Sequence, residues 1–475
     1  MYELGLLLLL VFNYLVFFYF IALNGVYLFT SLIAFREIRQ YVLRLKSLDL
    51  SELLGSAGMP PVTILVPAYN EEASCVESVR SLLSLNYADY SILVVNDGSD
   101  DATLQRLIAE FDMVRAARLP TAELPARAVR RTYQSRLHQN LWVIDKENGG
   151  KADALNAGLN HSTTPLFCAV DADSLLERDA LIRIVRPFLE DSKTVAAGGI
   201  IRIANDCDVV RGSVRRIRMP RNLLAQFQVL EYLRAFLAGR MGWAALDATL
   251  IISGAFGLFR RSLVVEAGGY ASSQTSVATV GEDMELVVRI HKVCREKKMP
   301  YRIRFVPDPV VWTECPESFR ELGRQRDRWQ RGMAESLLRH RDLFFNPKYG
   351  RIGMFAYPYF FLLETFGPFI ELAGYAAFIT AIAIGVASPT YVITFFMLAF
   401  VFGMVLSLAA VGLEELGFRR YPRVGDLVHL FGLAIVENFG YRQLTTVWRF
   451  HGLVSAIRGK QSWGKMTRRG FPKEA

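Results

Sequence analysis

An uncharged apolar segment at the N-terminus constrains the fold of this chain more than any other feature. No charged side chain occurs between Leu4 and Phe35. Because about 20 apolar residues suffice for a helix to cross a bilayer, residues 1–35 are predicted to form a transmembrane helix. The start Met1-Tyr2-Glu3 is not basic and the apolar stretch is long, and both facts argue against a cleaved signal peptide.

Basic residues follow this segment at once, and such residues are enriched on the cytoplasmic side of membrane helices. Residues 36–59 are therefore predicted to be a basic cytosolic linker. The net charge of +9 does not indicate a nucleic-acid partner, because the basic residues concentrate beside apolar segments, where the anionic head groups of a lipid bilayer account for them.

The middle of the chain, residues 60–341, is predicted to be a cytosolic α/β domain. Short β-branched runs alternate there with helical patterns, which indicates a mostly parallel, Rossmann-like sheet with its chemistry at the carboxyl ends of the strands. The stretch Arg115–Gln139 breaks this rhythm and is predicted to be an inserted surface loop. The predicted strands are Val62–Tyr69, Ser91–Asn96, Leu141–Asp145, Leu166–Val170, Val195–Ile203, Ile251–Phe259 and Ile303–Val311.

A second apolar block follows. Ile352–Ala387 and Tyr391–Val411 are each long enough to cross a bilayer. Pro358 and Pro368 are expected to separate an interfacial piece from the first of these spanning helices, because proline interrupts a regular helix.

The end of this block, Leu427–Ile457, contains three charged residues and fits an interfacial or re-entrant segment better than a clean span. Residues 342–457 are thus predicted to hold transmembrane and interfacial helices, and residues 458–475 a basic cytosolic tail. The chain is expected to be a multi-pass protein of the inner, or plasma, membrane with its α/β domain in the cytoplasm.

Two carboxylates follow a predicted apolar strand in Cys168-Ala-Val-Asp171-Ala-Asp173. Oxygen ligands at a strand end suit Mg²⁺ or Mn²⁺, which takes one or two carboxylates and completes its shell with phosphate oxygens and water. From the spacing alone, an Asp-rich turn that caps the next helix explains the pattern equally well.

Two further strand ends carry polar residues. After Val94-Val-Asn96 comes Asp97-Gly-Ser-Asp-Asp101, in which Asp100 or Asp101 could instead cap a helix that starts near Ala102. Asn148-Gly-Gly-Lys151 opens a helix with flexible glycines and a lysine, which suits a diphosphate, although Gly-rich turns before helices are common.

Gly281-Glu282-Asp283 opens another predicted helix. Thr279 and Glu282 fit a capping box, which is the structural explanation of this pattern. The functional alternative is a general base, a carboxylate that removes the proton of an attacking hydroxyl.

A fifth motif lies in the helix predicted over residues 316–341. Gln325, Arg328 and Trp329 share one helix face, and the neighbouring Arg326 is expected to point elsewhere. A guanidinium with an indole and an amide can hold a diphosphate and stack on a sugar ring. An amphipathic helix lying on anionic lipid explains the rest of this helix.

Taken in order, these motifs resemble the processive, membrane-integrated family 2 glycosyltransferases, which include the synthases of cellulose, hyaluronan, chitin oligosaccharides and poly-N-acetylglucosamine. The resemblance spans most of the chain and implies the A-type nucleotide-sugar glycosyltransferase fold, flanked by transmembrane and interfacial helices. It is nearest to bacterial poly-β-N-acetylglucosamine synthase-like members, on Lys146–Asn156 and Trp463–Met466. The motifs are Pro67-Ala-Tyr69-Asn70-Glu71, Asp97-Gly98, Asn148-Gly-Gly-Lys151, Asp171-Ala-Asp173, Ser253-Gly254, Glu282-Asp283 and Gln325-x-x-Arg328-Trp329.

The same resemblance implies a role for each motif. Asp283 would be the catalytic base, with Glu282 beside it, and Asp173 with Asp171 would hold Mg²⁺ or Mn²⁺. The residues implied to bind the nucleotide and donor are Tyr69, Glu71, Asp97, Lys151, Asp171, Gln325, Arg328 and Trp329. The residues implied to lie near the acceptor sugar are Ser253, Gly254, Phe256 and Trp329.

The implied activity is inverting, processive transfer of a sugar, with N-acetylglucosamine the first candidate, from a UDP-sugar to a growing glycan. The product would be an exopolysaccharide of the biofilm type, exported across the membrane with an accessory export subunit as a further partner. Two alternatives remain open: a non-processive transferase that places one sugar on a lipid carrier, and a transporter with a nucleotide-binding domain.

Overall fold

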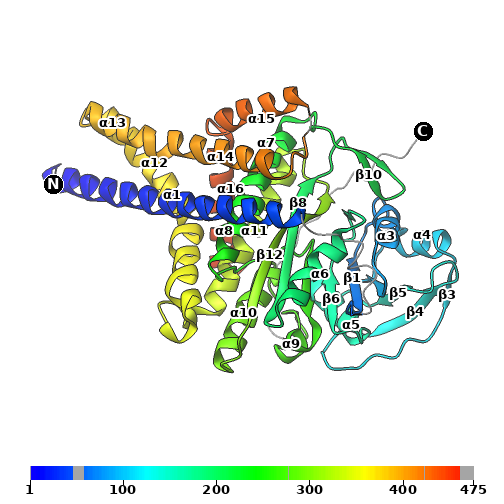
Figure 1. Ribbon diagram of the computed structural model, residues 1–475. Coiled ribbons are helices and arrows are strands. Elements are labelled where there is room, and N and C mark those ends of the chain that lie inside the picture. The colour runs from blue at the N-terminus through cyan, green and yellow to red at the C-terminus, as the bar shows by residue number, and fades with distance from the viewer. Residues whose placement is uncertain (1, 47–57, 276–277, 422, 460–475) are drawn as a thin grey trace. The chain divides into compact units, whose positions relative to one another are not determined.

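The computed structural model describes residues 2–46, 58–275, 278–421 and 423–459 (Figure 1). These residues form two compact units. The helical unit lies within Met1–Val42, Asn222–Ala245 and Pro316–Ser462, and the sheet unit within Leu43–Arg221 and Leu246–Cys315.

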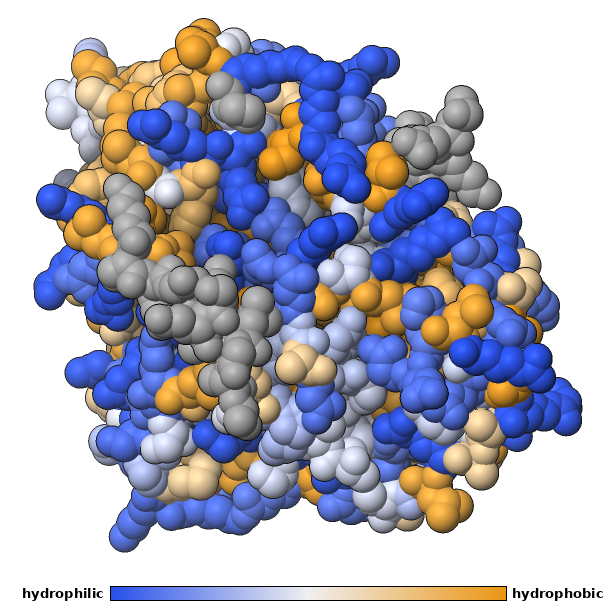
Figure 2. All heavy atoms as spheres, turned by 45° about the vertical axis from the view of Figure 1, so that its right-hand side comes forward, coloured by the Kyte–Doolittle hydropathy of each residue, from blue (hydrophilic) through white to orange (hydrophobic). Residues whose placement is uncertain are grey.

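The helical unit contains the predicted membrane segments. Helix α1, Tyr2–Lys46, continues past the expected end at residue 35. Among the described residues, Glu3–Leu45 and Pro389–Gly417 are long and apolar enough to cross a membrane. Many of their apolar side chains are exposed, including Leu8, Phe18 and Leu32 on α1, and Figure 2 shows hydrophobic side chains gathered together on the surface. Such an apolar surface suits contact with lipid.

A bent helix pair is a third potential span. Ile352–Thr365 and Gly367–Ala383 meet at an angle of 44°. The break, at residue 366, lies two residues before Pro368, whereas Pro358 lies inside the first helix of the pair. Two shorter helices cover Leu427–Ile457, and a break near Glu437 separates them. The predicted basic tail, from residue 460 onward, lies outside the described residues.

The remaining elements of this unit are α7 Leu223–Tyr232, η1 Leu233–Gly239, α8 Arg240–Ala245, α11 Phe319–Arg339, η2 Arg341–Leu343, η3 Pro347–Tyr349, η4 Ile352–Ala356, η5 Tyr359–Thr365, α12 Gly367–Ala383, α13 Pro389–Phe396, η6 Met397–Val401, α14 Phe402–Gly417, α15 Val424–Val436 and α16 Tyr441–Ile457.

The sheet unit is built on a mostly parallel sheet of ten strands in the order β3-β4-β5-β2-β1-β6-β11-β8-β12-β7. Strands β3, β4, β7 and β11 pair antiparallel with their neighbours. The strands are β1 Val62–Ala68, β2 Tyr90–Asn96, β3 Met113–Arg115, β4 Val129–Ser135, β5 Leu141–Lys146, β6 Leu166–Ala169, β7 Ser174–Leu176, β8 Thr194–Ile203, β11 Gly257–Arg260 and β12 Arg302–Thr313, with a separate hairpin of β9 Asp208–Val210 and β10 Ser213–Arg216. The helices are α3 Cys75–Leu83, α4 Thr103–Glu110, α5 Lys151–Asn160, α6 Ala180–Glu190, α9 Arg261–Glu266 and α10 Glu282–Glu296.

Two predictions about strands were wrong. Arg115–Gln139 is not a single loop, because Val129–Ser135 forms β4 and pairs antiparallel with β5. The first three residues of β4 are exposed, so its sequence lacks the apolar alternation that marks a half-buried strand. Ile251–Phe259 is extended only from Gly257, because residues 253–256 form a turn in which Phe256 N donates to Ser253 O.

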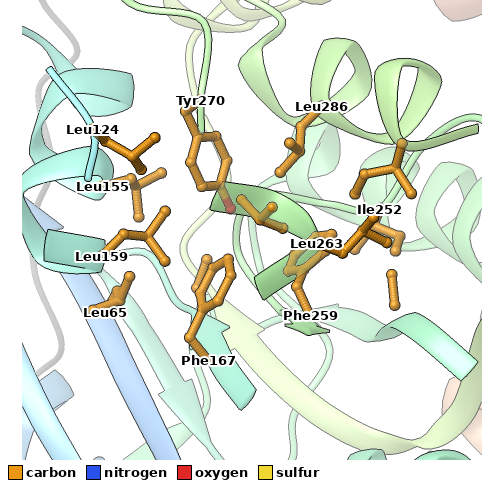
Figure 3. Packing of buried hydrophobic residues seen from close by; sticks show 14 of the residues in the cluster. Leu65, Leu124, Leu155, Leu159, Phe167, Ile252, Phe259, Leu263, Tyr270 and Leu286 are labelled. Atoms are coloured by element: carbon orange, nitrogen blue, oxygen red, sulfur yellow. The ribbon is translucent and has the colours of Figure 1, made fainter. Parts of the chain in front are cut away.

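The core of the sheet unit joins the strands to α5, α9 and α10. Phe167 of β6 stacks on Phe259 of β11 with their ring centroids 5.4 Å apart. Figure 3 shows Leu155 of α5 on one side of Tyr270 and Leu286 of α10 on the other. Full burial of each such side chain stabilises the fold by about 1.5–3 kcal/mol, so these helices are held firmly on the sheet.

Candidate functional site

The strand order places the predicted polar motifs at one edge of the sheet. Strands β1, β2, β5 and β6 are parallel neighbours, and the strand order reverses between β1 and β6. Ligands of open α/β sheets bind in the crevice at such a reversal, outside the carboxyl ends of the strands. Since β11 runs antiparallel to β6, the residues that precede Gly257 reach the same edge.

Four of the predicted motifs meet around the Lys151 ammonium. Its Nζ bonds to Asp171 Oδ1 and lies 3.6 Å from Glu282 Oε1. A Cβ at Gly254 would lie 2.8 Å from the same Nζ. The backbone N–H of Gly254 donates to Asp283 Oδ2 at 3.2 Å. Residues as far apart in the sequence as Lys151 and Asp283 thus form one cluster, in which three carboxylates surround or adjoin a single ammonium.

Burial controls the charges in this cluster. Glu282 is 4% exposed. Burial raises the pKa of its carboxyl, Lys151 lowers this pKa and Asp283 raises it, and together they place it at about 7. Burial by itself would lower the pKa of Lys151, but Asp171 and Glu282 outweigh it and raise the pKa of the ammonium. Lys151 is therefore a firmly charged cation at the sheet edge.

The capping-box explanation of Glu282 was wrong. Helix α10 begins at Glu282 with Gly281 as its N-cap and no side-chain capping bond. Thr279 Oγ1 instead accepts from Gly281 N at 3.2 Å. The Glu282 carboxylate is the one that approaches Lys151, so its position serves the cluster and not the helix end.

Asp97 is buried, and its carboxylate accepts three hydrogen bonds, from Lys146 and from the turn that follows it. Its Oδ1 accepts from Lys146 Nζ at 2.6 Å and from Gly149 N at 3.0 Å, and its Oδ2 accepts from Gly150 N at 2.7 Å. Lys146 also bonds to Asp153 Oδ2 at 2.6 Å. Lys146 and Asp153 were not predicted. The sequence signal for them was their place in the motif Lys146–Asn156, on either side of Gly149 and Gly150.

The other predicted nucleotide contacts lie next to β1. Tyr69 is 46% exposed and its hydroxyl donates to Asp100 Oδ2 at 3.2 Å. Glu71 Oε2 accepts from Ser74 Oγ at 2.8 Å. Asp101 Oδ1 accepts from Thr103 N, at the first residue of α4, at 2.9 Å, although the N-cap position of this helix is Ala102 and not Asp101.

Two predicted residues differ in their access to a ligand. The Phe256 ring is fully buried, so it offers no surface to a glycan in this conformation. Asp173 is 5% exposed, and Asp171 is the more open of the two strand-end carboxylates.

Within the described ranges no group of three or more His, Cys, Asp or Glu side chains could hold a metal. A pair of carboxylates still fits Mg²⁺ or Mn²⁺, which completes its shell with phosphate oxygens and water.

The motif of Gln325, Arg328 and Trp329 lies on α11 in the helical unit. Gln325 is buried and Trp329 is 39% exposed. The expectation that Arg326 points away from this face was wrong, since its guanidinium lies over the Trp329 ring, 4.2 Å from the centroid. Arg326 is held there by Glu231 Oε2 at 2.6 Å, which also accepts from Tyr441 Oη at 2.9 Å.

The mostly parallel sheet, with charged residues gathered at its switch point, agrees with the fold of a glycosyltransferase. Residues 60–332 match the family described as Glycosyltransferase like family 2, so the chain belongs to this family and is a glycosyltransferase. The A-type glycosyltransferase fold predicted from the sequence is thereby confirmed.

Proteins of two bacteria are similar to this chain. Poly-β-1,6-N-acetyl-D-glucosamine synthase of Staphylococcus aureus (strain COL) is 26% identical over 321 residues, which cover 67% of this chain and 64% of that protein. The probable glycosyltransferase YdaM of Bacillus subtilis (strain 168) is 28% identical over 314 residues, which cover 64% and 62%. The chain therefore matches a little under two thirds of the length of these relatives.

Among solved structures, a mannosyltransferase from Pyrobaculum calidifontis in complex with GDP-Man and Mn²⁺ matches 92% of this chain and 100% of its own, with a TM-score of 0.50 and 19% identity. At this identity the likeness supports the fold alone.

Proposed function

We propose that this glycosyltransferase transfers N-acetylglucosamine from UDP-N-acetylglucosamine to the end of a growing polysaccharide, with inversion at the anomeric carbon, and that it acts processively and exports the product. Its catalytic domain would comprise residues 60–341. The observation that carries the proposal is the cluster of Lys151, Asp171, Glu282 and Asp283 at the switch point of the sheet. The similarity to a poly-N-acetylglucosamine synthase supports the choice of sugar.

Asp283 is the proposed general base. Its Oδ2 accepts from Gly254 N at 3.2 Å and its Oδ1 from Met284 N at 2.8 Å, so the carboxylate is held in one orientation. The N-terminus of α10 favours its negative charge. The acceptor hydroxyl oxygen attacks the anomeric carbon, its proton passes to Asp283, and the bond from that carbon to the diphosphate breaks, which releases UDP.

Lys151 is the proposed partner of the leaving diphosphate. Its raised pKa keeps the ammonium charged, and a fixed cation near the developing phosphate charge lowers the barrier without reorganisation. Asp173 and Asp171 are the residues that would hold Mg²⁺ or Mn²⁺, which when bound neutralises phosphate charge. Tyr69, Glu71 and Asp97 are proposed to face the uridine.

The acceptor end is assigned to α11. Trp329 offers a partly exposed ring for a sugar, and Gln325 and Arg328 would contact the diphosphate. Ser253 and Gly254 would line the path of the incoming sugar. Among the described residues two helices could cross a membrane, and we propose that the chain lies in a membrane and that the bilayer and an accessory export subunit complete the route of the polymer.

The test uses the full chain in lipid with UDP-N-acetylglucosamine, other UDP-sugars, and Mg²⁺ or Mn²⁺. UDP release and a polymer ladder by mass spectrometry are expected. Asp283→Asn should lower turnover by about 10²–10⁴-fold with UDP binding retained, and Glu296→Gln, at the far end of the same helix, serves as the matched control.

Three outcomes would contradict the proposal in different ways. Near-normal turnover in Asp283→Asn removes the base assignment. Addition of a single sugar to a lipid carrier points to the non-processive alternative. Binding of nucleotide without release of UDP from any UDP-sugar argues against transfer altogether.

A further inference from the structure

A fully buried ion cluster lies beside the proposed donor site. The Lys146 side chain, at the end of β5, is 0% exposed and contacts two buried carboxylates, Asp97 and Asp153, each at 2.6 Å. Removing an ion from water costs several kcal/mol, which a buried pair recovers only when its geometry is precise. Three buried charges at one point are thus better explained by a requirement for geometry than by stability.

This cluster determines the shape of the turn formed by residues 148–150. Asp97 accepts from both Gly149 N and Gly150 N, and its backbone carbonyl accepts from Asn148 Nδ2 at 2.9 Å. A Cβ at Gly149 would lie 2.3 Å from Asp153 Oδ2, and Gly150 has a φ of +88°. The turn therefore packs directly on the two carboxylates that Lys146 holds, and glycine is required at both positions.

Lys151 follows this turn without any intervening residue. It is the first residue of α5, and its ammonium reaches Asp171 and Glu282. A shift of the turn moves the start of the helix and, with it, the base of the Lys151 side chain. The position of this cation thus depends on the buried cluster behind it.

We propose that Lys146 is a positioning residue, which holds Asp97 and Asp153 against the turn of residues 148–150 and thereby sets the place of the Lys151 ammonium for a nucleoside diphosphate. This inference rests on the proposed function where it assigns Lys151 to a diphosphate. Asp97 gains a second role, since its carboxylate anchors the turn as well as facing the nucleotide.

The main variant is Lys146→Met/Asp153→Asn, which removes one positive and one negative buried charge together. The matched control is Arg183→Met/Asp308→Asn, because Arg183 of α6 and Asp308 of β12 form another ion pair with a buried carboxylate in the same unit. Two quantities are measured on the full chain in lipid: amide hydrogen exchange of residues 148–151, and the Kd of UDP.

The expected result is at least tenfold faster exchange at Gly149 and Gly150 and at least tenfold weaker UDP binding in the Lys146 variant, with neither change in the control. Asp153→Asn alone, which keeps the shape of the side chain, should give smaller changes of the same sign and replaces the double variant should that variant not fold.

Unchanged exchange in a folded Lys146 variant, or equal changes in the control, would overturn the proposal. The exchange measurement needs no substrate. If the wild-type chain binds no UDP and turns over no UDP-sugar, the proposed function fails while the role of Lys146 in the turn is still decided.

Discussion

Gly254→Ala tests the cluster with the smallest possible change. The new Cβ would lie 2.8 Å from Lys151 Nζ, whereas ordinary contacts begin near 3.4 Å, so the ammonium would have to move by at least about 0.6 Å. Lys151 is flexible, but Asp171 and Glu282 hold its end. Gly254 has no left-handed backbone angle, so alanine there causes no backbone strain.

The expected effect falls on catalysis and not on folding. A misplacement of about 1 Å in a reacting site can cost about 10²-fold, so the smaller shift here should lower kcat/KM by about 10–100-fold, which corresponds to about 1.4–2.7 kcal/mol of barrier. The melting temperature should stay close to that of the wild type, because the group that is displaced is the end of a flexible side chain.

The assay is initial-rate UDP release in lipid vesicles, together with a thermal melt. Gly158→Ala is the matched control, since its Cβ would meet aliphatic carbons and no charged group in the same unit, with Leu65 Cδ2 at 3.0 Å and Val95 Cγ2 at 3.3 Å. If Gly254→Ala kept kcat/KM within twofold of the wild type, or if Gly158→Ala lost as much, the argument that the Lys151 position matters would be refuted.

Three further predictions follow. Burial raises the pKa of Glu282 from 4.5 to about 7, so the folded state binds this proton more tightly than the unfolded chain does. The free energy of unfolding should therefore fall as pH rises from about 4.5 to about 7. Glu282→Gln should flatten that decline in denaturant melts at several pH values. Arg326→Met should lower the free energy of unfolding by about 2 kcal/mol or more, since Glu231 would lose its cation, and Arg326→Lys should recover part of it in the same melts. Chelation by EDTA should abolish UDP release and added Mn²⁺ should restore it, with Asp173→Asn requiring more Mn²⁺ for half-maximal rate than an Asp101→Asn control.

Much of the fold follows from local patterns in the sequence. The uncharged stretch from Leu4 to Phe35 requires a helix that can lie in lipid, because a backbone in hydrocarbon must satisfy its own hydrogen bonds. The buried parallel strands are near-continuous apolar runs, so β1, β2, β5 and β8 agree with the predicted ranges within one residue at either end. Strand β4 was missed because an arginine-rich strand with exposed residues lacks that signal.

The candidate site also contains residues that the sequence could single out and contacts that it could not predict. Asp171, Lys151 and Asp283 could be singled out from the sequence, because strand ends and helix starts carry recognisable turn chemistry. Only the tertiary structure decided that the Lys151 ammonium meets Asp171 and Glu282, since that depends on the order of strands in the sheet.

Tertiary structure alone determined which charged side chains are buried. Lys146 and Arg326 are long cationic side chains, for which a position in water is the usual expectation. Each is instead buried against a carboxylate from a distant part of the chain, Asp97 in one case and Glu231 in the other. The sequence alone determined where the long apolar helices and the buried parallel strands lie. Long-range packing determined which charged side chains are buried, because a buried charge is stable only where another element supplies its partner.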